Sequence, residues 1–471
     1  MSSIGSLLSI ARTAMQTAQT QVATAGHNIA NAQSPGYSRQ TVNTAARVPE
    51  IRPDGAIGTG VGVTGITRAR DALLDAQVRS SSASASGANT AKGLLTSVQN
   101  VIGSSADTDL SGVLDQFYNA WGDLANNPAS ASSQANVQQR GLALATTFNN
   151  VANRLATIGA SAAETGRGLI TQVNTLTSQI AALNVQIVAG DAVSGSANDL
   201  KDARDRLVDQ LAQIVPVTVS DNANGSNRVL INGISLVDGG SPRTMSLLIG
   251  PTFQVSVAGS SDPMRFTDGS LGRTMQFINT DLPGVQSSLD QLASGIVTDV
   301  NALHAAGWSP SAGAAGNWNP ALGPTGSGVA FFDNTSAAAF TAHGMALSAT
   351  VAANSRAIAS SAVLNGTGDN TVALGVSALR DASPTSLAGS AVIDLRTLVN
   401  SVATRTATAN DDATVNTTLQ TQANDRRNSA TAVSTDEELT NLMKYQQAYI
   451  AASKLVNVVD ELAQSVLGLI R

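Results

Sequence analysis

The chain of 471 residues has few side chains in the arrangements on which enzymes depend. It contains no cysteine, and its histidines, His27, His304 and His343, are far apart and are followed by Asn, Ala and Gly. The sequence also lacks the HExxH zinc helix, the GxSxG elbow of serine hydrolases and the glycine-rich lysine loop that binds nucleotide phosphates. We predict a protein that is not an enzyme and has no catalytic residue, no cofactor and no metal site.

The glycines Gly60, Gly62 and Gly65 form a GxGxxG pattern. A dinucleotide site needs a buried strand before such a pattern and a helix packed against that strand. The preceding residues, IRPDGAIGT, do not read as a buried strand, and Val61 and Val63 alternate with glycine. We therefore interpret the segment as a turn-rich β ribbon and not as a nucleotide site.

Acidic and basic residues alternate along a predicted helix near residue 200. Their spacing allows ion pairs three and four residues apart, which is more typical of a solvated helix face than of a catalytic pair of acids. The residues are Asp199, Lys201, Asp202, Arg204, Asp205, Arg206 and Asp209.

Composition and length exclude further classes. The 27 basic and 33 acidic residues give a net charge of −6 without a concentrated basic face, so we expect no binding to nucleic acid. No run of about 18 apolar residues is present, so we expect no membrane insertion. The first residues lack the basic and apolar regions of a cleaved signal peptide, and export, if it occurs, should use another route. The length predicts roughly two to four domains.

Both ends of the chain carry apolar residues at the alternating three- and four-residue spacing of helices that pack side by side. We predict that these two helices pair antiparallel as a coiled coil. Many seam positions hold small residues, so the pair buries little apolar area. The free energy gained from that burial is smaller than the cost in conformational entropy of ordering the two helices. We therefore expect the ends to be loose in the free chain and to fold when neighbouring chains cover them. The predicted seam residues are Ile4, Leu8, Met15, Val22, Ile29, Leu442, Tyr445, Tyr449, Val456, Val459, Val466 and Ile470.

The first helix should end at the tetrapeptide Ser34, Pro35, Gly36 and Tyr37. Pro35 cannot continue a helix, and Gly36 supplies the positive φ that the third position of a type II turn requires. We interpret these four residues as a hinge turn between the terminal helix and the next domain. Arg39 has two open alternatives, pairing across subunits or exposure to solvent.

The predicted fold is mainly α with an inserted β module. The N- and C-terminal helices pair as a coiled coil formed by residues 1–45 and 430–471, and a shaft of long helices with loops and short strands covers 46–215 and 271–429. Between 216 and 270 the apolar period changes to two, and Asn232-Gly233 between two apolar runs predicts a hairpin in a small outer β domain.

Two segments between these elements have open interpretations. Residues 80–91 are either a flexible linker or the start of a weak helix. Residues 307–328 read as a long loop, in which Trp308 and Trp318 are expected to pack under the loop more than to hold a partner.

Five segments together resemble a known family. NIANAQSPGYSRQ (28–40) resembles the N-terminal motif of flagellar rod, hook and hook-associated proteins, and its GYSRQ ending is most similar to the FlgK family. The C-terminal segment DEELTNLMKYQQAYIAASKLVNVVDEL resembles the last helix of that family. FYNAWGDLANNP (117–128), NDLKDARDRLVDQLAQIVPVTV (198–219) and LDQLASGIVTDVNALHAAG (289–307) resemble its shaft in the same order.

The resemblance implies a structural, hook-associated protein of the bacterial flagellum. Such a protein is exported by the flagellar type III apparatus without a cleaved signal peptide, and it forms an extracellular ring at the junction between hook and filament. The implied partners are other copies of the same chain, the hook protein, the next junction protein (hook-associated protein 3) and a flagellar export chaperone. The outer β part of this chain is smaller than is usual in the family. Any surface role that an enlarged outer domain has in the family is therefore not expected of this chain.

Two alternatives are kept. The chain could be another flagellar axial protein, such as a hook or distal-rod subunit, although the shaft segments argue against this. It could also be a secreted effector with flagellar-like ends, which would need a reactive cluster within residues 216–380, where the sequence has none.

Overall fold

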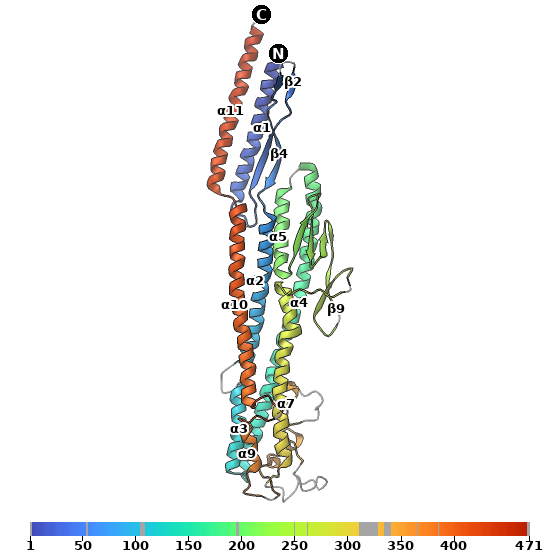
Figure 1. The fold of residues 1–471 in the computed structure, drawn as a ribbon, viewed down its shortest axis with the longest axis vertical. Helices are drawn as coiled ribbons and strands as arrows, with labels where there is room; N and C mark the ends of the chain where they lie inside the picture. Colours follow the sequence, from blue (N-terminus) through green and yellow to red (C-terminus); the bar gives the residue numbers. More distant parts are fainter. Residues whose placement is uncertain are drawn as a thin grey trace.

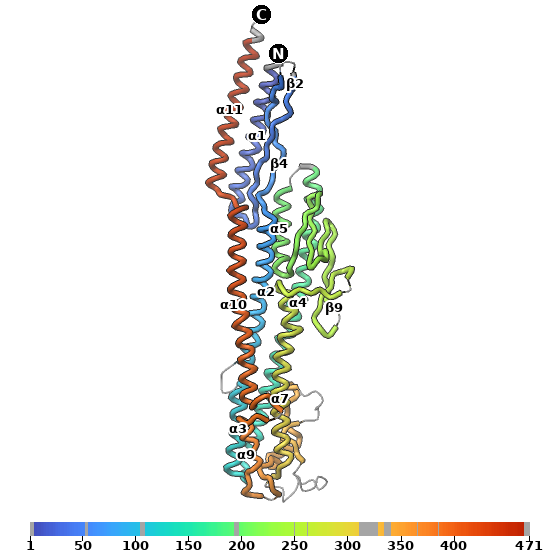
Figure 2. The backbone as a smooth tube through the Cα atoms, in the orientation of Figure 1, coloured from blue at the N-terminus to red at the C-terminus, as the bar shows by residue number. Residues whose placement is uncertain are grey.

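The computed structural model describes residues 2–52, 55–103, 109–194, 197–248, 250–260, 262–309, 328–333, 341–364, 366–384 and 386–468. The described chain forms a long rod of helices with a β module on one side (Figure 1), and the tube in Figure 2 shows that both ends of the chain lie at the same end of the rod. The expectation of a mainly α fold with an inserted β module is confirmed.

The terminal helices α1 (Ser2–Asn31) and α11 (Thr435–Gly468) lie side by side and run antiparallel (Figure 1), as the predicted coiled coil requires. Small side chains allow their close approach: Ala11, Ala18 and Ala25 recur every seven residues and are 0%, 2% and 2% exposed. On α11, Ala452 and Val459 are buried. The pair therefore rests on small residues, and it contributes less apolar burial than a leucine seam would.

A β arm lies along α1. It consists of β1 (Gln40–Ala46) paired antiparallel with β4 (Val61–Arg68), and of the short hairpin β2 (Glu50–Arg52) with β3 (Gly55–Ile57). Gly60 has a φ of +99°, and a Cβ at this position would meet the side chain of Thr13 and the backbone of Ile10. The GxGxxG segment is therefore a β ribbon, as predicted, with a glycine where the ribbon touches α1.

The shaft begins with two long helices, α2 (Ala72–Ile102) and α10 (Ala391–Thr431), which pack along each other. Their contact includes a small cluster of Ala91, Leu95 and Ala409. Residues 80–91 lie inside α2, so the helical alternative for this segment is correct and the linker alternative is wrong.

The far end of the rod holds the larger hydrophobic core. It is built from α3 (Leu110–Asn126), the first half of α4 (Ala131–Ser194), α7 (Leu282–Ala306), α9 (Thr371–Ala378) and the start of α10. Aromatic rings of Phe117, Trp121, Phe331 and Phe332 meet at its centre. Trp308 is 4% exposed and packs as predicted, whereas Trp318 and most of the predicted loop lie outside the described residues.

Short helical segments connect the elements of this end. A short π-helix, Phe277–Asp281, joins α6 (Gly269–Gln276) to α7. The others are α8 (Ala349–Ala353) and the 3-10 turns Ala342–Gly344 and Ser355–Ala357.

The second core joins the last half of α4, α5 (Asn198–Ile214) and α6 to the β module. Asn232 and Gly233 have φ values of +47° and +82° and connect β6 (Asn227–Ile231) to β7 (Ile234–Asp238), so the predicted hairpin is confirmed. The sheet order is β5-β6-β7-β8, with β9 and β10 paired separately. The strands are β5 (Thr218–Asp221), β6 (Asn227–Ile231), β7 (Ile234–Asp238), β8 (Ser241–Pro242), β9 (Met245–Leu248) and β10 (Gln254–Val257).

The strands β5 to β10 all lie within the predicted insert of residues 216–270. The predicted boundary after residue 45 falls inside β1, which pairs with β4, so the arm joins residues that the sequence analysis placed in two domains. The division into domains otherwise stays a prediction.

Candidate assembly joint

The chain reverses direction directly after α1, between the terminal helices and the shaft. The backbone N–H of Ser34 donates to the carbonyl of Asn31 at 2.9 Å, and that of Tyr37 donates to Ser34 at 3.1 Å. Gly36 has a φ of +74°, and a Cβ there would lie 2.5 Å from Cγ of Arg206 on α5. The turn therefore needs glycine for its backbone and for its approach to the shaft. The hinge role of Ser34 to Tyr37 stays a prediction.

Asn28 ties the turn back onto α1. Its side chain accepts from the hydroxyl of Tyr37 at 2.8 Å and from the backbone N–H of Gln40 at 3.0 Å, and its amide donates to the Gln40 carbonyl at 2.9 Å. Asn28 is 1% exposed. Burial and the nearby charges of Asp199 and Asp202 raise the pKa of Tyr37, which keeps its hydroxyl protonated as the donor.

The segment after the turn is fixed to α5 and α11. The backbone N–H and hydroxyl of Ser38 both donate to Asp202, at 2.9 and 2.8 Å. The guanidinium of Arg39 donates to Glu438 at 2.8 Å and to Glu437 at 3.2 Å, at the start of α11. Arg39 therefore pairs within the chain and is not simply exposed to solvent, and its pairing across subunits stays a prediction.

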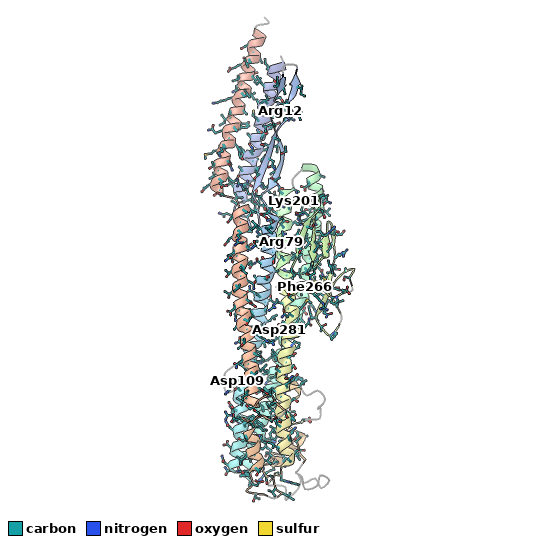
Figure 3. The ribbon with its side chains drawn as sticks, viewed as in Figure 1. Arg12, Arg79, Asp109, Lys201, Phe266 and Asp281 are labelled. Carbon is teal, nitrogen blue, oxygen red and sulfur yellow. The ribbon has the colours of Figure 1, made fainter. Side chains whose placement is uncertain are left out.

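Arginine and aspartate side chains from four further segments meet below the turn, and we call this group the joint cluster. It connects the end of β4 and the start of α2 to α5 and to the end of α10, and Figure 3 shows Arg79 at this level of the rod. The joint cluster consists of Arg68, Arg70, Asp75, Arg79, Asp202, Arg204, Asp205, Asp209 and Arg427.

Asp205 is a buried carboxylate of the joint cluster that pairs with three arginines, Arg68, Arg70 and Arg204. Arg70 and Arg68 donate to it at 2.7 and 2.9 Å. Burial alone would raise the pKa of Asp205, but the surrounding guanidinium groups of Arg70, Arg68 and Arg204 outweigh burial and hold its pKa below the ordinary value. Asp205 therefore stays ionised, and it links the arm to α5.

Asp209 provides a second link. It accepts from Arg79 of α2 at 2.9 Å and from Arg427 of α10 at 2.7 Å. One carboxylate of α5 thus joins both long helices of the shaft near the point where α10 gives way to α11. A group of paired, largely buried charges has a narrow range of acceptable geometries, so the joint cluster should fix the angle between the terminal helices and the shaft.

The prediction of a solvated ion-pair face on α5 is wrong. Asp202, Arg204 and Asp205 are 2%, 3% and 6% exposed, because β4 and α2 cover that face and supply its partners. Arg204 pairs with the adjacent Asp205, and Lys201 pairs with Asp191 of α4. Sequence reasoning missed the joint cluster, although RARDALLDAQVR (68–79) is unusually rich in charge for a chain with 13% charged residues.

The described members of the predicted seam belong to α1 and α11 and have different degrees of burial. Val459 is 3% exposed and Leu8 is 46% exposed. Ile470 and the side chain of Val466 lie outside the described residues. The role of the seam in assembly stays a prediction. The half-buried members are Ile4, Met15, Val22, Ile29, Leu442, Tyr445, Tyr449 and Val456.

The described polar contacts at the joint are hydrogen bonds and ion pairs. Within the described ranges, His, Asp and Glu side chains do not gather in a group that could hold a metal ion. Of the helices in the described part of the chain, none is both long and apolar enough to cross a membrane.

Comparison with known families gives two matches. The model of the flagellar hook-associated protein FlgK helical domain matches residues 95–317. The model of the flagellar basal body rod FlgEFG protein C-terminal region matches residues 427–469, which include the end of α10 and all of α11.

Individual relatives match over most of the chain. Flagellar hook-associated protein 1 of Bacillus subtilis is 28% identical over 98% of this chain and 97% of its own length. Flagellar hook-associated protein 1 of Salmonella typhimurium is 29% identical over 65% of this chain and 57% of its own length. The structure of the flagellar hook junction protein FlgK from Burkholderia pseudomallei has a TM-score of 0.63, 17% identity, and coverage of 76% of this chain and 100% of that one, which supports the fold.

Proposed function

We propose that this chain, which belongs to the FlgK family of flagellar hook-associated proteins, forms part of the junction between the hook and the filament. It is a structural component of the flagellum. The match to the Bacillus subtilis protein along almost the full length of both chains carries the proposal, since it covers the terminal segments of this chain as well as its shaft.

The proposed mechanism uses the joint. The terminal helix pair and the shaft are separate packing units, and the turn at Gly36 with the joint cluster sets the angle between them. In a tube or ring, that angle decides whether the terminal helices of every copy can lie in the wall while the shaft lies at another radius. A copy with a loose joint would fit poorly between its neighbours.

We further propose the partners and the route. The chain is exported by the flagellar type III apparatus without a cleaved signal peptide and assembles as a homo-oligomeric ring outside the cell. Its partners are the hook protein, hook-associated protein 3 and an export chaperone. It catalyses no reaction. The low apolar content of the α1 and α11 contact supports export of an easily unfolded end.

Another axial position is the second candidate. The match of residues 427–469 to the rod family C-terminal model favours it, because that segment is common to rod and hook proteins. The match of residues 95–317 to the FlgK helical domain favours the junction instead, because it covers the shaft.

Deletion of the gene in its own cells tests the proposal. We expect cells with complete hooks and no filaments, which secrete flagellin into the medium, and immunogold labelling of the restored protein at the hook tip. Labelling along the hook or in the rod would favour the second candidate. Normal filaments in the deletion strain would contradict both. A chain lacking residues 440–471 should be secreted and yet fail to restore filaments.

A further inference from the structure

The tip of the β arm exposes large aliphatic side chains. Val48 and Ile51 are 85% and 87% exposed, the highest values for large hydrophobic residues in the described part of the chain. Both belong to the segment at β2, which lies beside the N-terminal end of α1 (Figure 1). These two aliphatic side chains, three positions apart in the sequence, are a candidate surface for contact with another molecule.

A second set of apolar residues is exposed on α11. Val458 and Leu462 are 48% and 45% exposed, and they lie in the last third of the helix, toward its free end. The exposed residues continue down the helix toward the joint, and the set consists of Leu439, Met443, Ile450, Val458 and Leu462. These side chains are separate from the buried residues Ala452 and Val459, which face α1.

The two apolar sets belong to the outer layers of one three-layer arrangement. Helix α1 contacts α11 and also contacts β1 and β4 of the arm. Figure 1 shows α11 on one side of α1 and the arm on the other. The arm tip of a chain is therefore separated from its own α11 by α1. Complementary patches on opposite sides of a subunit form a heterologous contact, which generates rings or helical assemblies of identical copies.

Charges near the two sets are complementary. Arg47, next to Val48, is exposed and forms no ion pair among the described residues, while Glu50 in the same segment has a polar contact of its own. At helical spacing, the exposed acid Glu461 borders the strip of Val458 and Leu462 on α11. Glu461 forms no ion pair among the described residues. A basic group at the arm tip and an acid beside the apolar residues of α11 can therefore pair between two copies.

We propose that the arm tip of one copy, Val48 and Ile51 with Arg47, docks on the last third of α11 of a second copy, at Val458 and Leu462 with Glu461. The contact would cover apolar surface that the single chain leaves exposed, and it would link the terminal helices of adjacent copies in one direction around the assembly. The inference rests on the proposed function, because it needs an assembly of identical copies.

Cross-linking tests the contact, and the absence of cysteine from the chain makes single cysteine variants unambiguous. Two variants, Ile51→Cys and Leu462→Cys, are produced together in the same cells, and isolated flagella are mildly oxidised. We expect a covalent dimer from the mixture and at least a tenfold lower yield from either variant alone. The matched control pairs Ile51→Cys with Val415→Cys, an exposed position on α10 (57%) within the shaft.

A substitution test follows the same contact. The double variant Val48→Ser, Ile51→Ser should reduce the number of filaments at least tenfold, whereas Leu73→Ser, at a position 77% exposed on α2, should leave it unchanged. Arg47→Glu should have the same effect as the double variant, and Glu461→Arg in the same chain should restore filaments at least in part. Circular dichroism checks that each variant folds like the parent.

The outcomes separate this inference from the proposed function. If the parent chain labels the hook tip but no Ile51–Leu462 dimer forms, or if the control pair links equally well, the docking contact is wrong and the junction role stands. Normal filaments from a folded double-serine variant would also overturn the contact. If the parent chain is absent from the flagellum, the proposed function itself fails.

Discussion

The guanidinium of Arg39 and the carboxylate of Glu438 lie 2.8 Å apart, although 399 positions separate them in the sequence. The side chain of Glu438 is 4% exposed and that of Arg39 is 31% exposed. This pair joins the segment after the N-terminal turn to the first turn of α11. It therefore couples the two ends of the chain at the place where both meet the shaft.

Removal of Arg39 should destabilise the joint, because the carboxylate of Glu438 would stay buried without its partner. For Arg39→Leu we expect a loss of about 3 kcal/mol in the free energy of unfolding. Arg228→Leu is the control. The side chains of Arg228 and Asp238 are 44% and 49% exposed, so their ion pair should contribute less than about 1 kcal/mol to the free energy of unfolding. Chemical denaturation measures both. Equal losses in the two variants would show that Glu438 is not buried as described.

Gly36→Ala should weaken the turn. A φ of +74° is strained for alanine, and the new Cβ would push the stem of Arg206 away from its position 2.5 Å distant. We expect a loss of about 1–2 kcal/mol and poor incorporation into flagella. Gly5→Ala is the control in α1, where a Cβ would meet nothing within 4 Å. It should stabilise the helix by about 1 kcal/mol. Under the hinge hypothesis, replacing both Pro35 and Gly36 with alanine should block incorporation into flagella. Normal filaments from this double variant would refute the hypothesis.

His304 should make the far end of the shaft sensitive to acid. Its ring is fully buried, with Nδ1 2.7 Å from the Val329 carbonyl and Nε2 accepting from the Ala359 N–H at 3.0 Å. Nε2 is therefore unprotonated. Burial lowers the pKa of His304 from 6.5 to about 4, and the hydrogen bond to Val329 offsets this only in part.

The sign of the effect follows from proton uptake. Below pH 6.5 the unfolded chain protonates this histidine, whereas the folded chain does so only near pH 4. The stabilising contribution is complete above pH 6.5 and is lost as the pH falls toward 4, by about 3 kcal/mol in all. Denaturation at a series of pH values measures this slope. His304→Gln should reduce it, and an unchanged slope would contradict the assignment.

Local sequence signals predicted much of the fold. The heptads of α1 and α11, the Pro-Gly stop after α1 and the Asn232-Gly233 hairpin depend on residues close together in the chain. The sequence did not predict α10 as a separate helix within the shaft. Its buried positions include Thr406, Ala409 and Ala413, which give a weak apolar pattern.

The joint cluster could not be predicted in the same way. Asp202 binds Ser38 and Arg68, which are 164 and 134 positions away. A charged residue on a helix reads as solvated until the segment that covers it is known, and no local pattern identifies that segment. The same limit applies to Arg39, whose partner on α11 depends on the antiparallel pairing of the two ends.

The terminal helices depend on neighbouring copies to complete their packing. The contact of α1 with α11 is made largely by small residues such as Ala11, Ala18 and Ala25, whereas the far end of the shaft buries Trp121, Phe117 and Phe148. The buried apolar surface between α1 and α11 therefore stabilises the closed pair only weakly. Contacts with neighbouring copies should provide the remaining stabilisation.

Amide hydrogen exchange, read by mass spectrometry on the dilute monomer and on isolated flagella, tests this claim most directly. We expect α1 and α11 to exchange at least a hundredfold faster than α3 and α7 in the monomer and to become as protected as those helices in the flagellum. If α1 and α11 are already as strongly protected as α3 and α7 in the dilute monomer, the ends are complete without neighbours and the proposed assembly mechanism is wrong.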